Sequence, residues 1–175
     1  MNEILKIPEI SKKKGRSLKK FKPLLTNNVI AMVPVRAGST RIPNKNTRPF
    51  GDLSLLQLKL KLLKKIVGIT KIVVSTDCPI SADVAWNNGV EVQWRNKYYA
   101  GSEITNDLHW FHIADTTPGD IVFLAQVTSP LLKVSSMQSA LNSFLNSKIY
   151  DSINSVSAEK KFLWENSKPI NYDIN

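Results

Sequence analysis

The sequence has little cysteine, few aromatic side chains and no long hydrophobic run. Its single cysteine, Cys78, excludes an internal disulfide and a cysteine-based metal cluster. No apolar stretch approaches the ~20 residues that cross a bilayer. Charges also interrupt the apolar residues of the N-terminus, so a secretory signal is not expected. These absences predict a cytoplasmic protein that does not associate with membranes. The composition, 42% apolar and 22% charged, is that of an ordinary globular domain.

The positive charge is concentrated at one end of the chain. Residues 1–28 contain eight of the 24 basic residues against Glu3 and Glu9, so +6 of the net charge of +10 belongs to this segment. A flexible, solvated arm is the favoured interpretation, and an arm that binds polyanions is the alternative. Phe21 is its one aromatic residue, which is too few for a base-stacking surface. Nucleic acid is therefore not the expected partner. The remaining residues, 29–175, are predicted to form one domain.

Apolar runs alternate with amphipathic segments along this domain. Short continuous runs such as Val29–Val35 are typical of strands buried on both faces. The predicted strands are 29–35, 71–76, 90–94, 121–125 and 151–156, and the predicted helices are 55–67, 80–88, 106–116 and 134–146. Such alternation indicates an α/β fold with a mostly parallel sheet covered by helices on both faces. Ligands of these folds bind beyond the carboxyl ends of the strands, where the polar loops after Val35, Thr76, Trp94 and Gln126 are expected to meet.

The loop from Arg36 to Asn46 has the residue types of a phosphate site. It matches neither a Walker A loop nor a dinucleotide fingerprint, because it lacks their further glycines. Gly38 allows close approach of the backbone, and Ser39 provides a hydrogen bond. The three spaced cations of the loop, Arg36, Arg41 and Lys45, suit phosphate oxygens. The alternative is a solvated basic loop without a ligand.

The order of residues in this region resembles a known family. The run Pro-x-Arg-x-Gly-Ser-x-Arg-Ile-Pro-x-Lys-Asn over 34–46, followed by Pro-Phe-Gly and a leucine-rich helix, is similar to the opening of the acylneuraminate cytidylyltransferase (CMP-N-acetylneuraminic acid synthetase) family. The Lys45-Asn46 pair favours this branch over the related 3-deoxy-manno-octulosonate branch, which usually has Lys-Pro there. Residues 72–77 and 124–131 also resemble family segments, although Asn96 and Val127 stand where the family usually has proline.

The resemblance implies a Rossmann-like three-layer nucleotidyltransferase fold and a reaction. CTP would activate a sialic acid-like nonulosonic acid, giving a CMP-sugar and pyrophosphate, with Mg²⁺ neutralising charge on the triphosphate. Lys45 and Arg36 would be catalytic through the charge that they place at the phosphates. The implied CTP-binding set is Arg36, Gly38, Ser39, Arg41, Lys45, Asn46, Arg95, Ile104 and Asn106, of which the last four would surround the cytidine; Gln126 would face the sugar.

Several of these residues have a structural alternative. Arg95 would then pair with Glu91 or Glu103 on the surface. Asn106 and Gln126 would be ordinary N-cap and turn residues. Asp77 is expected to cap the helix that follows it rather than to bind a metal.

Two further residue pairs lie on the predicted helix 106–116. His109 and His112 are one turn apart, near the spacing of metal ligands, but no third ligand is visible in the sequence. A half-exposed helix face is therefore the favoured interpretation of the two histidines. Trp110 and Phe111 are expected to pack this helix into the core.

The family continues well beyond the position of Asn175. That further part contains sugar contacts, elements that form a homodimer and a pair of metal-binding aspartates, so no metal ligand is identifiable here and the chain looks truncated at its C-terminus. Three explanations compete: a fragment, which is favoured, a catalyst completed by a partner chain, and a non-catalytic nucleotide-binding relative. Two different functions also stay open, namely a nucleotidyltransferase for another base or sugar and a nucleic-acid-binding module that uses the basic arm. Weak CTP binding and slow or absent turnover are expected of the chain as it stands.

Overall fold

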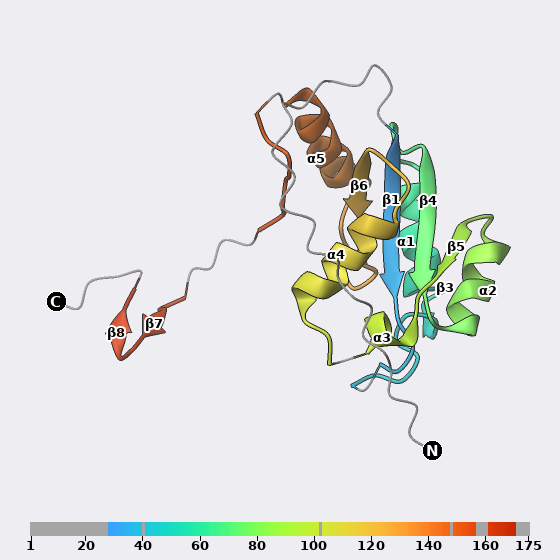
Figure 1. The fold of residues 1–175 in the computed structure, drawn as a ribbon, viewed down its shortest axis with the longest axis horizontal. Coiled ribbons are helices and arrows are strands. Elements are labelled where there is room, and N and C mark those ends of the chain that lie inside the picture. The colour runs from blue at the N-terminus through green and yellow to red at the C-terminus, as the bar shows by residue number, and fades with distance from the viewer. Residues whose placement is uncertain (1–27, 40, 102, 148, 157–160, 171–175) are drawn as a thin grey trace.

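A computed structural model describes residues 28–170, apart from residues 40, 102, 148 and 157–160, and its centre is a parallel sheet (Figure 1). The strands lie in the order β5-β4-β1-β6, and all neighbours run parallel. Their bounds are β1 Val29–Val35, β4 Lys71–Thr76, β5 Glu91–Trp94 and β6 Ile121–Leu124. The predicted basic arm falls on residues outside the described part of the chain, apart from Asn28.

Helices cover both faces of this sheet. The helices are α1 Leu55–Leu63, α2 Pro79–Asn87, α3 Lys97–Ala100, α4 Asn106–Thr116 and α5 Val134–Asn146. Helix α4 lies on one face, and α1, α2 and α5 pack on the other (Figure 1). Two short hairpins, β2 Pro49–Phe50 with β3 Leu53–Ser54 and β7 Trp164–Glu165 with β8 Lys168–Pro169, complete the described elements. The predicted three-layer α/β architecture is confirmed.

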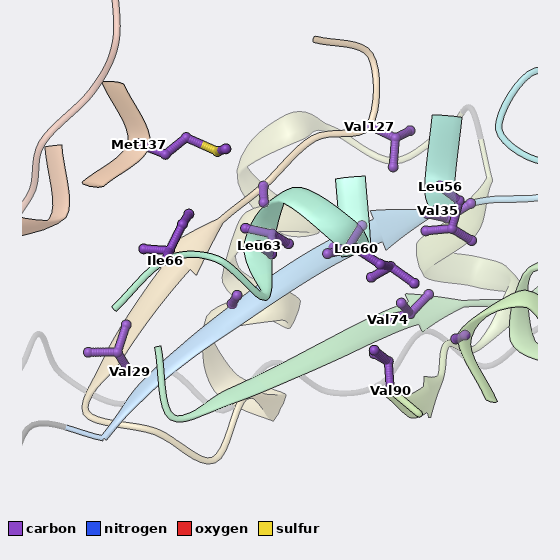
Figure 2. Packing of buried hydrophobic residues seen from close by; sticks show 14 of the residues in the cluster. Val29, Val35, Leu56, Leu60, Leu63, Ile66, Val74, Val90, Val127 and Met137 are labelled. Atoms are coloured by element: carbon purple, nitrogen blue, oxygen red, sulfur yellow. The ribbon is translucent and has the colours of Figure 1, made fainter. Parts of the chain in front are cut away.

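The central position of β1 in the sheet explains why its sequence is apolar throughout. Alternate residues of a strand point to opposite faces. Val29, Ala31, Val33 and Val35 therefore join the larger core beneath α1, α2 and α5, part of which Figure 2 shows. Ile30 and Met32 join a smaller cluster against α4. Both faces of β1 are covered, so a polar residue on either face would lose its water without gaining a partner.

Local signals fix where the helices begin and end. Ser54 caps α1 in a capping box: its Oγ accepts from the Gln57 amide at 3.2 Å, and Gln57 Oε1 accepts from the Ser54 amide at 2.8 Å. Gly89 ends α2 with a φ of 63°, and bonds from Gly89 to Trp86 and from Val90 to Ala85 complete a Schellman motif. Within the described ranges, no helix combines the length and apolar character needed to span a bilayer.

Three sequence-based expectations about the fold are wrong. Residues 151–156 form no strand; all six are exposed, so their apolar side chains have no core to enter. Helix α1 stops at Leu63, because Ile66 turns back into the core while Val67 faces solvent. Phe111 is 56% exposed, whereas its neighbour Trp110 packs against the α4-side cluster, since adjacent helical residues point in different directions.

Candidate functional site

A cavity of about 560 Å³ opens at the carboxyl ends of the strands, where the sequence predicted a ligand site. We call it the strand-end cavity. Its lining comes from the loop after β1, from Arg95 after β5, from the segment after β6 and from α4. The lining residues are Pro34, Arg36, Ser39, Arg41, Ile42, Lys45, Asn46, Arg95, His109, Trp110, Gln126, Val127 and Thr128. Four of them are Lys or Arg and none is Asp or Glu, so the cavity favours an anionic ligand.

A tight turn presents Lys45 to the cavity. The Lys45 amide donates to the carbonyl of Ile42 at 3.2 Å, and Asn44 has a φ of 51°. Proline at the second position and a positive φ at the third are the features of a type II turn, and Asn is the commonest residue after Gly to accept that φ. The backbone of the turn therefore favours the Pro43-Asn44 pair at its two central positions. The Asn44 carbonyl also accepts from the amides of Thr47 and Arg48, at 2.9 and 2.8 Å.

The start of the same loop is held by Asp77. Asp77 Oδ1 accepts from the Ala37 amide at 2.8 Å, which ties the loop after β1 to the end of β4. The expectation that Asp77 caps α2 is wrong, because the N-cap position is Cys78 and no side chain caps that helix. Arg36 donates to the carbonyl of Ala100 at 3.3 Å, which fixes its guanidinium at the cavity edge. Gly38, with a φ of 71°, lets the chain change direction directly after these anchors.

Arg95 is the most deeply placed cation of the site, with 5% of its surface exposed. Its Nη2 donates to the carbonyls of Val35 at 3.1 Å and Ser75 at 2.6 Å, so one side chain joins the ends of β1 and β4. Burial lowers the pKa of Arg95, Asp77 opposes this, and Arg36 adds to it. The guanidinium nevertheless stays charged, since its ordinary pKa lies far above neutrality. The alternative in which Arg95 pairs with Glu91 on the surface is wrong, because Arg95 is buried and Glu91 pairs with Lys71 at 2.5 Å.

Two buried polar atoms at the cavity have no partner among the described residues. They are Oδ1 of Asn46, a residue that is 8% exposed, and Nε of Arg95. A buried polar atom without a hydrogen bond costs about 1–3 kcal/mol, so such atoms commonly mark the position of a ligand or a water molecule. One is an acceptor and the other a donor.

Helix α4 supplies a wall that the sequence did not predict. His109 and Trp110 both line the cavity. His109 Nδ1 lies 3.3 Å from the carbonyl of Tyr99, and Tyr99 stacks on His112 with ring centroids 3.8 Å apart. Burial lowers the pKa of His109 most, and the charge of Arg95 acts in the same direction. The spacing of Asn106 and His109 on one helix face was the available signal for this wall.

A buried lysine supports the wall formed after β6. Lys59 lies on the apolar face of α1 with 2% of its surface exposed, and its Nζ donates to the Ser129 carbonyl at 3.1 Å. Burial lowers the pKa of Lys59. The preceding residues Gln126 and Thr128 line the cavity. The start of α1 is also tied to the cavity, since the Leu56 amide donates to the Asn46 carbonyl at 3.0 Å. This helix thus braces two walls of the cavity.

The structure brings seven of the ten predicted site residues together at the cavity: Arg36, Ser39, Arg41, Lys45, Asn46, Arg95 and Gln126. Gly38, Ile104 and Asn106 are not in its lining. Gly38 instead shapes the loop, and Asn106 is the first residue of α4, after the N-cap Thr105. The alternative of Asn106 as the N-cap is therefore wrong. Gln126 is exposed, and its Oε1 accepts from Thr128 at 3.5 Å.

The described residues do not fit a magnesium ion held by the protein alone. The cavity lining contains no carboxylate, and no group of three His, Cys, Asp or Glu residues lies together within the described ranges. Mg²⁺ prefers carboxylate and phosphate oxygens. Among the residues that line the cavity, cations would meet the phosphates directly.

Comparison with known proteins agrees with this geometry. A family model described as Cytidylyltransferase matches residues 30–169. The chain is 32% identical, over 120 residues, to a CMP-N,N'-diacetyllegionaminic acid synthase of Legionella pneumophila; the match covers 65% of this chain and 51% of the relative. The chain thus spans about half the length of that curated relative.

Two solved structures are similar in fold. A cytidylyltransferase from Leptospira borgpetersenii is 30% identical with a TM-score of 0.54, and the match covers 68% of this chain and 49% of that one. A CMP:2-keto-3-deoxy-manno-octonic acid synthetase complexed with CTP has a TM-score of 0.61 at 15% identity, with 70% and 49% covered, which shows the fold alone. Because the family model covers most of the chain, including every residue that lines the cavity, this chain belongs to the cytidylyltransferase family.

Proposed function

We propose that this chain is the nucleotide-binding part of an enzyme that transfers CMP from CTP to a sialic acid-like nonulosonic acid and releases pyrophosphate. The observation that carries the proposal is the strand-end cavity, lined by four cations and no carboxylate, in a member of the cytidylyltransferase family. The similarity to a legionaminic acid synthase supports a nonulosonic acid as the second substrate.

The charges of the cavity suit the phosphate chemistry of this reaction. A sugar hydroxyl attacks the α-phosphorus and releases its proton to solvent, the new O–P bond forms, and the bond to pyrophosphate breaks as negative charge moves onto the leaving oxygens. Lys45 and Arg36 serve as the catalytic cations that stabilise this charge, and Arg41 and Ser39 bind the rest of the triphosphate. Fixed donors of this kind contribute most when they are already in place before the reaction, as the turn at Asn44 and the bond from Arg36 to Ala100 provide.

The nucleoside lies toward Asn46 and Arg95 in this proposal. Their unpaired Oδ1 and Nε offer one acceptor and one donor, and a cytosine edge carries an amino group beside acceptor atoms. A site built from such buried groups discriminates strongly against a base that leaves them unpaired. Ile104 and Asn106 stay proposed cytidine contacts, although they do not line the cavity here.

The sugar and metal parts of the proposal involve fewer of the described residues. Gln126, at the exposed edge of the cavity, is the proposed sugar contact. Mg²⁺ would enter on the phosphates of CTP, since the cavity lining offers no carboxylate. Because the chain spans about half of its curated relative, we propose that the rest of the sugar site and a homodimer contact belong to residues beyond those described.

Thermal shift measurements with a panel of nucleotides test the proposal. We expect CTP to raise the melting temperature more than UTP, GTP or ATP, because only a bound ligand stabilises the folded state. Replacing Lys45 with Ala should weaken CTP binding about 10- to 100-fold, since a hydrogen bond to a charged group contributes about 1.5–3 kcal/mol. Lys61→Ala, an exposed lysine on α1, is the matched control and should bind CTP like the wild type.

Three results would count against this proposal. Equal stabilisation by all four nucleotides would show that the site does not select cytosine. An unchanged response of Lys45→Ala would remove that residue from the site. Pyrophosphate release with CTP and N-acetylneuraminate distinguishes a catalyst from a nucleotide-binding relative, and we expect this chain alone to be slow.

A further inference from the structure

His109 occupies a position that the proposed function does not use. It lines the strand-end cavity from α4, together with Trp110. It is partly buried, and its ring is held in place by an edge contact with Trp110 at a centroid distance of 4.6 Å and by the Tyr99 carbonyl. A side chain restrained on two sides can present a fixed atom to a ligand.

The bond to Tyr99 determines which ring nitrogen is free to accept. A carbonyl oxygen only accepts hydrogen bonds, so the contact of 3.3 Å requires the hydrogen on Nδ1. The neutral ring has one N–H, and Nε2 then carries a lone pair. Burial lowers the pKa of His109 most, Arg95 and Arg36 lower it further, and the hydrogen bond to Tyr99 opposes them; the pKa is lowered on balance, which favours this neutral form at pH 7. His109, which lines the cavity together with four cations, therefore has an uncharged acceptor atom.

We propose that His109 is a specificity-determining residue whose Nε2 accepts a hydrogen bond from an amino or hydroxyl group of the ligand. This inference depends on the proposed function for the identity of the ligand. Ionised phosphate oxygens have no hydrogen to donate, so His109 contacts the nucleoside or the sugar and not the triphosphate. The role is distinct from that of Lys45 and Arg36, which bind anionic oxygens.

Two substitutions at His109 separate an acceptor from a space-filling ring. His109→Phe keeps an aromatic ring in contact with Trp110 but removes the acceptor. His109→Gln keeps a donor for the Tyr99 carbonyl and an oxygen that accepts. His112→Phe is the matched control, because His112 stacks on Tyr99 one turn further along α4 and is not part of the cavity lining. Thermal melts of all three variants verify that each is folded.

Calorimetric titration with CTP, with inorganic tripolyphosphate, and with N-acetylneuraminate on CTP-saturated protein provides the readout. We expect His109→Phe to weaken either CTP or the sugar about 10-fold, as for a lost hydrogen bond in a partly buried site. Tripolyphosphate binding should not change, His109→Gln should retain most of the affinity, and His112→Phe should behave like the wild type. A lower affinity of His109→Phe for CTP places the hydrogen-bond donor on the nucleoside. A lower affinity for N-acetylneuraminate alone places the donor on the sugar.

Four results overturn the inference. These are unchanged affinity of His109→Phe for both ligands, an equal loss in His109→Gln, an equal loss for tripolyphosphate, and the same loss in His112→Phe. A wild-type chain that binds no CTP in these titrations contradicts the proposed function instead, so the two failures are distinguishable.

Discussion

Lys59 shows how one side chain can serve the site from inside the core. Helix α1 buries Leu56, Lys59, Leu60 and Leu63, a spacing of three and four residues that normally contains only apolar side chains. An ammonium group in such a place loses its water, and a single carbonyl replaces only part of it. We infer that Lys59 serves to hold the Ser129 carbonyl, and with it the segment that contains Gln126 and Thr128.

Replacing Lys59 with Met tests the cost of this buried charge. Methionine has a similar length, so we expect the free energy of unfolding at pH 7 to rise by about 1 kcal/mol as the desolvation cost disappears. Because the folded-state pKa of Lys59 lies below its ordinary value of 10.5, the unfolded state binds more protons between those two values. The wild type should therefore gain stability as the pH rises toward 10.5, and Lys59→Met should not.

Urea unfolding at pH 7, 9 and 10 measures both effects. Lys61→Met, an exposed position two residues further along α1, is the control and should retain the wild-type pH dependence. A Lys59→Met variant that is less stable at every pH would show that the bond to Ser129 outweighs the desolvation cost.

At the scale of elements, the turn before Asn46 connects sequence to chemistry most directly. The positive φ of Asn44 sets the direction in which Lys45 leaves the backbone. Glycine accepts this φ without strain, whereas a β-branched residue does not. Asn44 is therefore expected to affect CTP binding through its backbone conformation, which orients Lys45, and not through a contact of its own with the ligand.

Asn44→Gly and Asn44→Val form a matched pair at this turn. We expect Asn44→Gly to keep CTP binding within about twofold of the wild type, because the turn is retained. Asn44→Val should cost about 1–2 kcal/mol of stability and weaken CTP binding, because valine disfavours the left-handed conformation. Calorimetric titration with CTP and thermal melts give the two numbers. Equal CTP affinity in both variants would show that Lys45 is positioned by something other than this turn.

The elements themselves differed in how well the sequence predicted them. Helices 106–116 and 134–146 are found with the predicted bounds. The signal for 134–146 was its apolar face, and the signal for the end of 106–116 was the Pro118-Gly119 turn that follows it. The strand at 151–156 was wrong because alternating apolar residues such as Ile153 and Val156 indicate a strand only where a sheet edge and a core are available. The pattern of apolar residues alone does not show whether a sheet edge and a core lie next to the segment.

The site was predictable where one loop contains it and less so where the fold assembles it. The residue types of the Arg36–Asn46 loop suited a phosphate site, and its resemblance to a known family assigned CTP to it. Arg95 was assigned by resemblance, but its bonds to Val35 and Ser75 depend on how three strands end together. His109 and Lys59 were missed because a histidine or lysine among apolar residues is usually surface-exposed, and only the packing of α4 and α1 places them otherwise.

At the scale of the whole molecule, the two histidines of α4 make stability depend on pH. Burial lowers the pKa of both histidines. Arg95 and Arg36 lower that of His109 further, and the bond to Tyr99 opposes this. Arg95 and His109 lower that of His112 further, and Asp115 opposes this. The unfolded chain has the ordinary value of 6.5 and binds more protons below it. Stability should therefore be constant above about pH 7 and fall as the pH drops through 6.5.

The double variant His109→Gln, His112→Gln tests this dependence. Urea unfolding at pH 7.5, 6.5 and 5.5 should show a smaller loss of stability in the variant than in the wild type, and carboxylates contribute little to the change above about pH 5. Parallel losses in the two proteins would mean that other groups cause the acid sensitivity.

The position of β1 between β4 and β6 has a consequence for synthesis on the ribosome. Val29 pairs with Ile121, so one side of the central strand finds its partner only after more than half of the chain has been made. At about 5–20 residues per second, the interval between these two residues takes on the order of 5–20 s. During that time β1 has β4 on one side and an open backbone edge on the other, which is a template for unwanted strand pairing. A newly made chain should therefore depend on chaperones most before Leu124 emerges.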